Sequence, residues 1–393
     1  MPTLYDVAHF CSWNGYTEDM RPYLGVDTAS WTNSEFWSPH GANLLYGPAK
    51  KSRIQIICEH GWYSDAQFSK NYNAVARIRE LIADGAKPDI KDANGCSALL
   101  VCARDEFDQN LEIIKVLLDA GADVNQANGI HNFTALILSA SNGHIEIVRE
   151  LIRRGADVNL PSKAGVMAIE CAAESGHMDV VKELFAAGAV INEGIFNDII
   201  EGGYMPLLKY ILTIAPPDED SVFDAVYHNQ PNMIRVLAKA GANMNFGLPI
   251  HWAIQEEYHK CLIALCVNGA NLNILNPEND SPLRYAITKG DYEAIKILVD
   301  HKADINDVMD SRPLIHWAID MYRSCREEKR KKCLLAMIDA GPNFKLLNQE
   351  GNTAAEHAED RGMSDIVTLI KRAELKQRFL LNTKVSERSK NKK

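Results

Sequence analysis

A histidine, a cysteine and a tryptophan alternate near the start of the chain, as His9, Cys11 and Trp13. A cysteine nucleophile needs a histidine within hydrogen-bond reach of its sulfur and a third group that orients the histidine. Residue spacing alone does not establish that geometry, so the three residues are a weak signal. They leave open the hypothesis that the aromatic-rich first segment forms a ligand pocket or a thiol catalytic site.

The rest of the chain lacks spacings typical of metal sites or catalytic sites. The pairs Cys96 with Cys102 and Cys261 with Cys266 do not have the spacing of a zinc knuckle, and no paired histidines accompany them. Nucleophile-elbow, phosphate-loop, kinase and zinc-protease signatures do not occur either. We therefore predict a protein that is not an enzyme, with no catalytic residue, no cofactor and no metal.

One stretch, residues 134–159, shows how the chain is organised. Leu136 and Leu138 belong to a short apolar helix, and Gly143 permits the backbone to reverse after it. A second helix follows over residues 145–152, with apolar residues near i, i+3, i+4 and i+7 spacing. Gly155 then marks its end. A unit this small cannot bury its own apolar face and needs stacked neighbours.

The same unit recurs along the chain. The motif Gly-Ala-Asp-Val-Asn begins at Gly121 and Gly155, 34 residues apart, and a related motif begins at Gly188, 33 residues later. Further variants start at Gly85, Gly241, Gly269 and Lys302, and helix-opening motifs recur as Ser97-Ala98-Leu99, Ser281-Pro282-Leu283 and Thr353-Ala354-Ala355. A helix-turn-helix unit of about 33 residues is the ankyrin period. Over at least residues 74–372 the chain therefore resembles the ankyrin-repeat family.

The resemblance implies an all-α ankyrin-repeat solenoid, in which stacked helix pairs carry β-turn fingers. About nine to eleven repeat-like units are expected. Five histidines occupy positions that are structural in this family, with the imidazole hydrogen-bonding between adjacent turns: His144, His177, His251, His316 and His357.

Five segments are expected. The spacing between Gly188 and Gly241 is 53 residues, which fits two short helix pairs without fingers. An inserted charged run, residues 323–332, is expected to lengthen both helices of a later repeat. The segments are 1–73, a divergent aromatic-rich cap; 74–192, regular repeats; 193–247, degenerate short helix pairs; 248–375, further repeats; and 376–393, a basic disordered tail.

Charge and composition exclude several classes of protein. The formal net charge is −10, of which residues 376–393 contribute +6, so residues 1–375 carry −16. An acidic body argues against nucleic-acid binding, and no apolar run approaches the length of a membrane span. The first residues do not read as a secretory signal, and nine scattered cysteines fit reduced thiols. We therefore expect a cytoplasmic monomer that binds no nucleic acid and no membrane.

The resemblance also indicates where a partner would bind. Finger turns and inner helices of stacked repeats form a concave face whose residues the core does not need. The finger Asn128–Phe133 is one residue longer than its neighbours, which exposes an aliphatic and an aromatic side chain, or folds Phe133 back onto the next finger. The predicted partner-binding residues are Asn94, Ile130, His131, Phe133, Ser141, Asn142, Lys163, Glu174, Ser175, Glu278, Asp280 and Lys289.

These observations predict a non-enzymatic scaffold or adaptor that binds a protein with a basic surface. One alternative is an effector secreted by an intracellular pathogen to bind a host protein, since a basic C-terminus is compatible with an export signal. The other is the ligand or thiol-catalytic pocket in the first segment.

Overall fold

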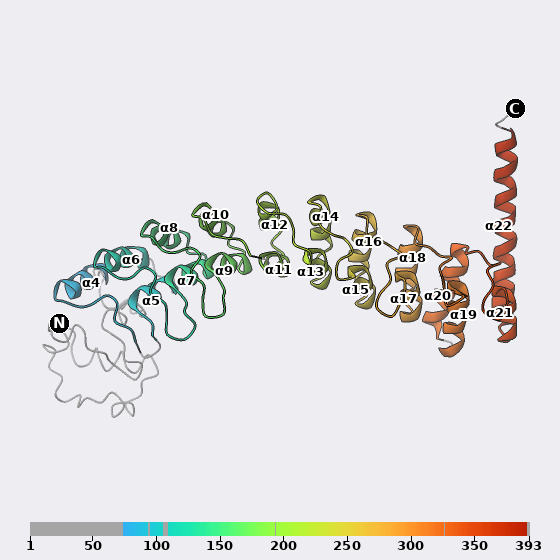
Figure 1. The fold of residues 1–393 in the computed structure, drawn as a ribbon, viewed down its shortest axis with the longest axis horizontal. Coiled ribbons are helices and arrows are strands. Elements are labelled where there is room, and N and C mark those ends of the chain that lie inside the picture. Colours follow the sequence, from blue (N-terminus) through green and yellow to red (C-terminus); the bar gives the residue numbers. More distant parts are fainter. Residues whose placement is uncertain (1–73, 93–94, 105–108, 193, 326, 391–393) are drawn as a thin grey trace, which may run out of the picture. The chain divides into compact units, whose positions relative to one another are not determined.

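The computed structural model describes residues 74–92, 95–104, 109–192, 194–325 and 327–390. Within these residues the chain forms helices α4 to α22 and one short antiparallel hairpin. The helices divide into two compact units, the first ending at Gly202 and the second beginning at Gly203. Each unit is a stack of helical hairpins in two layers (Figure 1).

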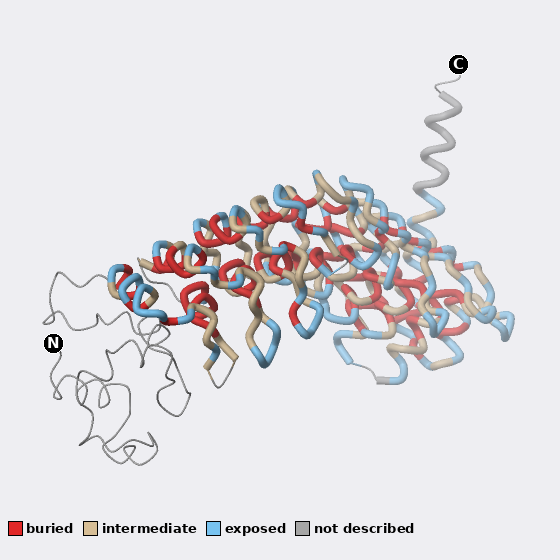
Figure 2. Tube along the Cα trace, turned by 60° about the vertical axis from the view of Figure 1, so that its left-hand side comes forward, coloured by how far each residue is buried: buried red, intermediate tan, exposed pale blue. Residues whose placement is uncertain are grey.

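The first unit contains α4 to α11. The inner helices α5, α7, α9 and α11 contact one another in sequence order, and the outer helices α4, α6, α8 and α10 do the same. The core lies between the two layers, where Figure 2 shows the buried residues. The bounds are α4 Ala74–Ala83, α5 Ala98–Arg104, α6 Asn110–Asp119, α7 Ala135–Ser141, α8 Ile145–Arg153, α9 Ala168–Glu174, α10 Met178–Ala186 and α11 Ile195–Glu201.

The second unit begins with α12 and repeats the two-layer arrangement. Its inner helices are α13, α15, α17, α19 and α21, and its outer helices are α14, α16, α18, α20 and α22. The bounds are α12 Met205–Ile211, α13 Ser221–Tyr227, α14 Pro231–Lys239, α15 Pro249–Gln255, α16 His259–Val267, α17 Pro282–Lys289, α18 Tyr292–Asp300, β1 Val308–Met309, β2 Arg312–Pro313, α19 Leu314–Cys325, α20 Glu328–Ala340, α21 Ala354–Asp360 and α22 Ser364–Lys390.

The repeat around α7 and α8 shows why the sequence folds this way. The Thr134 hydroxyl caps α7 by accepting from the Ile137 amide at 3.2 Å. Gly143 then reverses the chain at φ +74°. A Cβ added there would lie 2.6 Å from atoms of the His177 ring, so glycine is required both for the turn and for the close approach of the next repeat.

Adjacent repeats are joined by a row of side-chain amides at the Asn that ends each Gly-Ala-Asp-Val-Asn motif. Asn125 Oδ1 accepts from the Asp157 amide at 2.8 Å, and Asn159 Oδ1 accepts from the Val190 amide at 2.9 Å. In the second unit, Asn273 Oδ1 accepts from the Asp304 amide at 3.0 Å. The recurring asparagine therefore fixes the register between neighbouring repeats.

The predicted all-α stack of helix-turn-helix pairs, irregular in the middle, is confirmed. The connections 212–220 and 240–248 contain no strand, whereas the later connection 301–313 carries the hairpin β1–β2. The charged insertion lengthens two helices as predicted, since α19 has 12 residues and α20 has 13. The finer segment boundaries stay a prediction, and the predicted cap over residues 1–73 lies outside the described residues.

The predicted disordered tail from residue 376 was wrong in the described part, because α22 continues to Lys390. The prediction weighed only the scarcity of apolar residues. Leu, Lys, Gln and Arg are all good helix formers, and no glycine or proline interrupts the chain after Gly362. The helix therefore extends from a packed start, where Ile366 and Ile370 are buried.

Candidate partner-binding surface

The finger before α7 forms a closed turn that presents an apolar side chain. The Asn128 amide donates to the Phe133 carbonyl at 3.0 Å, and the Asn128 side chain accepts from the amides of His131 and Phe133. Ile130 at the tip is 51% exposed. Phe133 is half-buried, with its ring centroid 5.4 Å from that of His131. Ile130 is thus available for contact, while Phe133 packs within its own finger.

The next finger lies beside this one. The Lys163 amide donates to the His131 carbonyl at 2.8 Å, so the structure brings these two predicted site residues together. The Lys163 side chain is exposed. Asn94, the residue predicted for the preceding finger, lies outside the described residues. The fingers of the first unit therefore form one continuous edge that carries Ile130, His131 and Lys163.

A second group of predicted residues lies at the far end of the inner helices. Ser141 ends α7, and its carbonyl accepts from His177 Nε2 at 3.1 Å. Asn142 is exposed and folds its amide back onto the Leu138 carbonyl at 2.8 Å. Glu174 is exposed at the end of α9, and Ser175 is its half-buried C-cap residue. Opposite ends of the inner helices thus carry the two groups of predicted residues.

Carboxylates gather where α9 meets α11. Burial, followed by the charges of Glu174, Glu170 and Glu201, raises the pKa of Asp198 to about 6. The same carboxylates act on a neighbouring thiol. Burial raises the pKa of Cys171 to about 11, and the charges of Glu174, Glu170 and Asp198 contribute to the shift. An anionic cluster whose members repel one another is stabilised by an approaching cation. The charges of Glu170, Glu174 and Asp198 therefore make this part of the inner face acidic.

In the second unit the predicted residues flank α17. Asp280 precedes the helix and its carboxylate lies 2.8 Å from Arg284 Nε, in an ion pair. Glu278 is exposed two residues earlier, and Lys289 is exposed in the last turn. Lys289 Nζ lies 5.6 Å from the ring centroid of Tyr285. The structure therefore places Glu278 and Asp280 before the helix and Lys289 at its other end.

Sequence reasoning missed an aromatic cluster on α13 and α15. The ring centroids of Phe223 and Tyr227 lie 5.7 Å and 5.6 Å from that of Trp252. Tyr227 is 52% exposed, and Phe223 and Trp252 are half-buried. The signal was present as aromatic residues four apart on α13 and as the repeated Ile-His-Trp-Ala-Ile motif. The 53-residue spacing predicted that this stretch lacks fingers, but the contact of these rings between α13 and α15 is visible only in the structure.

The predicted structural role of the repeat histidines is confirmed where a hydrogen bond joins neighbouring repeats. His177 Nε2 bonds to Ser141, as described, and His251 Nε2 bonds to the Asp280 carbonyl at 3.0 Å. His144 differs, because its buried Nε2 has no hydrogen-bond partner among the described residues.

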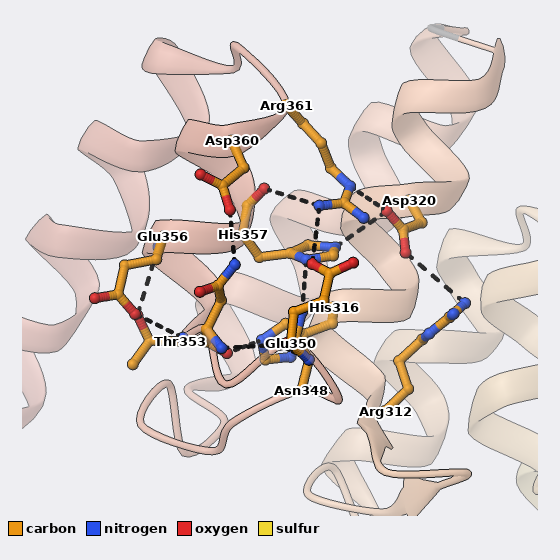
Figure 3. Close-up of polar contacts among 11 residues, drawn as sticks. Arg312, His316, Asp320, Asn348, Glu350, Thr353, Glu356, His357, Asp360 and Arg361 are labelled. Atoms are coloured by element: carbon orange, nitrogen blue, oxygen red, sulfur yellow. Dashed lines mark hydrogen bonds and ion pairs between the residues drawn. The ribbon is translucent and has the colours of Figure 1, made fainter.

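The last two of these histidines belong to a polar network between α19 and α21 (Figure 3). The rings of His316 and His357 meet edge to face, 5.0 Å between centroids. Asp320 accepts from His357 Nε2 at 3.0 Å and from Arg361 Nε at 2.7 Å. His316 is fully buried and His357 is 2% exposed. Both histidines are buried between two packed helices, which favours a structural role.

The part of the chain that the structure describes bears on two kinds of chemistry, a thiol nucleophile and a metal site. Burial raises the pKa of Cys261, Cys266 and Cys333 to about 11 each, so these thiols stay protonated and are not activated nucleophiles. No three histidine, cysteine or acidic side chains among the described residues gather so as to hold a metal ion. His9, Cys11 and Trp13 lie outside those residues. No described helix is both long enough and apolar enough to cross a membrane.

Known proteins resemble this chain through its repeats. The family described as ankyrin repeats (3 copies) matches residues 109–194, 222–309 and 250–327. Human diacylglycerol kinase iota is 28% identical over 158 residues, covering 40% of this chain and 14% of that protein. The putative ankyrin repeat protein FPV034 of fowlpox virus is 28% identical over 95 residues, covering 24% of this chain and 23% of that protein. Mouse ankyrin repeat and SOCS box protein 6 is 32% identical over 95 residues, covering 24% of this chain and 22% of that protein.

The chain thus spans under a quarter of the length of these relatives. The match alone therefore does not assign the activities of those whole proteins to this chain. What they have in common with this chain is the stretch of repeats. That stretch has the paired helices, the finger turns and the amide row described above. Repeats of this kind are typically non-enzymatic modules for contact with other proteins. The chain belongs to the ankyrin-repeat family.

Proposed function

We propose that the protein is a non-enzymatic scaffold or adaptor that binds a partner protein with a basic surface. The face used is formed by the fingers and the inner helices. The observation that carries the proposal is the combination, within the first unit, of exposed Ile130 on the finger edge with the carboxylate cluster around Asp198 on the inner helices. The apolar anchor contributes affinity, and the like negative charges attract a cationic partner.

The proposal extends to the state of the protein in the cell. Six cysteines in the described part of the chain are free thiols, which is consistent with a reducing compartment. We therefore propose a cytoplasmic location, and we keep the monomer as part of the proposal. The similar proteins come from human, mouse and a poxvirus, that is, from host organisms and from a pathogen, so the hypothesis of a secreted effector stays a prediction. The pocket hypothesis concerns residues outside the structure's description and stays a prediction.

The test is affinity capture with matched variants. One variant combines Ile130→Ala, Phe133→Ala and Glu174→Lys on the inner face. The control reverses one charge on an outer helix, as Asp179→Lys on α10, where the side chain is exposed. We expect one protein to be captured by the parent and by the control but lost by the inner-face variant, while all three keep the same helical circular dichroism. Capture that is equal for all three would place the partner elsewhere.

A further inference from the structure

The connection between α14 and α15 replaces a finger with a tight turn against an aromatic ring. A Cβ added at Gly247, where φ is +71°, would lie 3.1 Å from the Phe223 ring. The next residue, Leu248, has φ +57°, a conformation that costs free energy for a residue with a side chain. The turn therefore stays close to α13 and no finger stands beside the aromatic cluster. Phe246 in the same turn is 39% exposed.

The rings of the cluster form a surface across two inner helices. Tyr227 and Trp252 stack at an interplanar angle of 29°, and Phe223 meets Trp252 at 59°. Because Tyr227 is half exposed, this stack faces solvent on one side. A ring face is the negative part of the aromatic quadrupole, which attracts cations and gives stacked guanidinium groups a favourable contact.

Two carboxylates lie on or next to the helices that carry these rings, and no ion pair balances them among the described residues. Asp224 lies between Phe223 and Tyr227 on α13, and Glu256 follows Trp252 by four residues. Neither carboxylate forms an ion pair with a residue in the described ranges. Burial, then the charges of Asp218 and Asp220, raises the pKa of Asp224 to about 6. A half-buried carboxylate under like-charge repulsion is stabilised when a cation binds next to it.

In the next two repeats, the equivalent aromatic rings are covered by the cationic groups of lysine and arginine side chains. Tyr285 and Trp317 occupy the same position as Trp252, directly before the buried alanine of each inner helix. Lys289 Nζ lies 5.6 Å from the Tyr285 ring centroid. The Arg284 guanidinium lies 4.1 Å from the Trp317 centroid, and Arg312 follows at 5.5 Å. Both rings are thus covered by cations of this chain, whereas no described cation covers Trp252 or Tyr227.

We propose that Tyr227, Trp252 and Asp224 form a subsite for an arginine side chain of an extended basic segment in a partner protein. The guanidinium would stack on the exposed face of the two rings and pair with the carboxylate of Asp224, as Arg284 stacks on Trp317 and pairs with Asp280. Lysine would bind less well, because it lacks the planar group that stacks on a ring. This proposal deepens the proposed function, on which it rests, by naming the partner's chemistry in the second unit.

The experiment measures binding of a fluorescein-labelled peptide of alternating arginine and glycine to the full chain by fluorescence anisotropy. Tyr227→Leu, Trp252→Leu and Asp224→Asn are compared with the parent. We expect each to weaken binding by about five- to tenfold, in line with a cation–π or charge contact of about 1 kcal/mol. A lysine–glycine peptide should bind more weakly than the arginine peptide, and a glutamate–glycine peptide should not bind.

Two matched variants separate the subsite from general attraction to an acidic protein. Tyr292→Leu removes an aromatic ring, and Asp300→Asn an exposed carboxylate, both on outer helix α18. Both should bind the arginine peptide as the parent does. Because Asp224→Asn and Tyr227→Leu change exposed or half-exposed groups, they test the site even if Trp252→Leu loses stability.

Three outcomes overturn the subsite. The first is equal weakening by the α18 variants, and the second is failure of the parent to bind the arginine peptide. The third is loss of peptide binding only with Glu174→Lys in the first unit. That third result would leave the proposed function standing, with the basic segment on the other unit. The proposed function itself fails only if capture is unchanged by the inner-face variant, so the two failures are distinguishable.

Discussion

Replacing Asp320 by alanine is expected to loosen the last repeats of the second unit and leave the first unit unchanged. The Asp320 carboxylate accepts from His357 and Arg361 across the contact of α19 with α21 (Figure 3). His357 is 2% exposed, so its ring N–H cannot regain a hydrogen bond from bulk water. Leaving one buried donor unpaired costs about 1–3 kcal/mol.

The expected total for Asp320→Ala is about 3 kcal/mol, because Arg361 is partly buried and loses its closest anion as well. The 3.8 Å contact with Arg312 adds little, since that side chain is largely exposed. Asp320→Asn keeps an acceptor of the same shape and loses only the charge. It should cost about 1 kcal/mol, which makes it the matched control.

Urea unfolding followed by circular dichroism gives the total loss, and hydrogen exchange gives its location. Stacked repeats need not unfold together, so the second measurement is necessary. Amides of α19 and α21 should lose protection in Asp320→Ala, while those of α7 and α9 should not. A loss below about 1 kcal/mol, or one spread evenly over both units, would refute the argument from the buried donor.

The same network sets a dependence on pH. Burial alone would raise the pKa of Asp320, but the hydrogen bond and charge of His357 and the charge of Arg361 outweigh it and lower the pKa. A carboxylate with a lowered pKa stabilises the folded state above its unfolded pKa, and this contribution is lost as pH falls through the folded pKa. The difference between the parent and Asp320→Ala should therefore shrink below about pH 4. A difference that stays constant down to that pH would contradict the charge argument.

Further predictions concern the first unit. Asp198→Asn should stabilise the protein by about 1 kcal/mol at pH 7 and not at pH 4. The raised pKa of Asp198 gives the folded state a stability contribution that is lost as pH rises from about 4 to 6. Equal melting temperatures of the parent and the variant at pH 7 would contradict this. Asn125→Ala should cost about 1 kcal/mol in urea unfolding, because the Asp157 amide loses its acceptor, and Asn125→Asp should recover most of it. Gly143→Ala should lower the free energy of unfolding by about 2 kcal/mol or more, through a clash with the His177 ring and strain at positive φ. In the double variant, His177→Ala should remove the clash but not the strain. Additive losses of stability in the double variant would argue against the contact.

Periodicity predicted the fold because each repeat carries its own local signals. Thr134 caps one helix, Gly143 turns the chain, and Gly155 ends the next helix, all within one repeat. Such signals need no knowledge of distant residues. The recurring asparagine of the repeat motif was visible as well, although its hydrogen bond to the following repeat emerges only from the stacked structure.

The site was less predictable because it depends on contacts between repeats. Phe223 and Tyr227 share a face of α13 by spacing alone, but their contact with Trp252 on the next inner helix is visible only in the structure. The raised pKa of Asp198 likewise arises from carboxylates on another helix. The sequence prediction of disorder after residue 376 was also wrong, because a count of apolar residues does not measure helix propensity.

The most direct test of the central claim, that a partner protein binds the finger and inner-helix face, is site-specific photo-crosslinking in living cells. One variant carries a benzophenone amino acid at Ile130 on the finger, and the matched control carries it at Asp179 on outer helix α10. Both positions are exposed, so each accepts the probe without disturbing the core. The account predicts a discrete adduct with one protein from Ile130 and none from Asp179. An adduct with the same protein from Asp179 alone would contradict it.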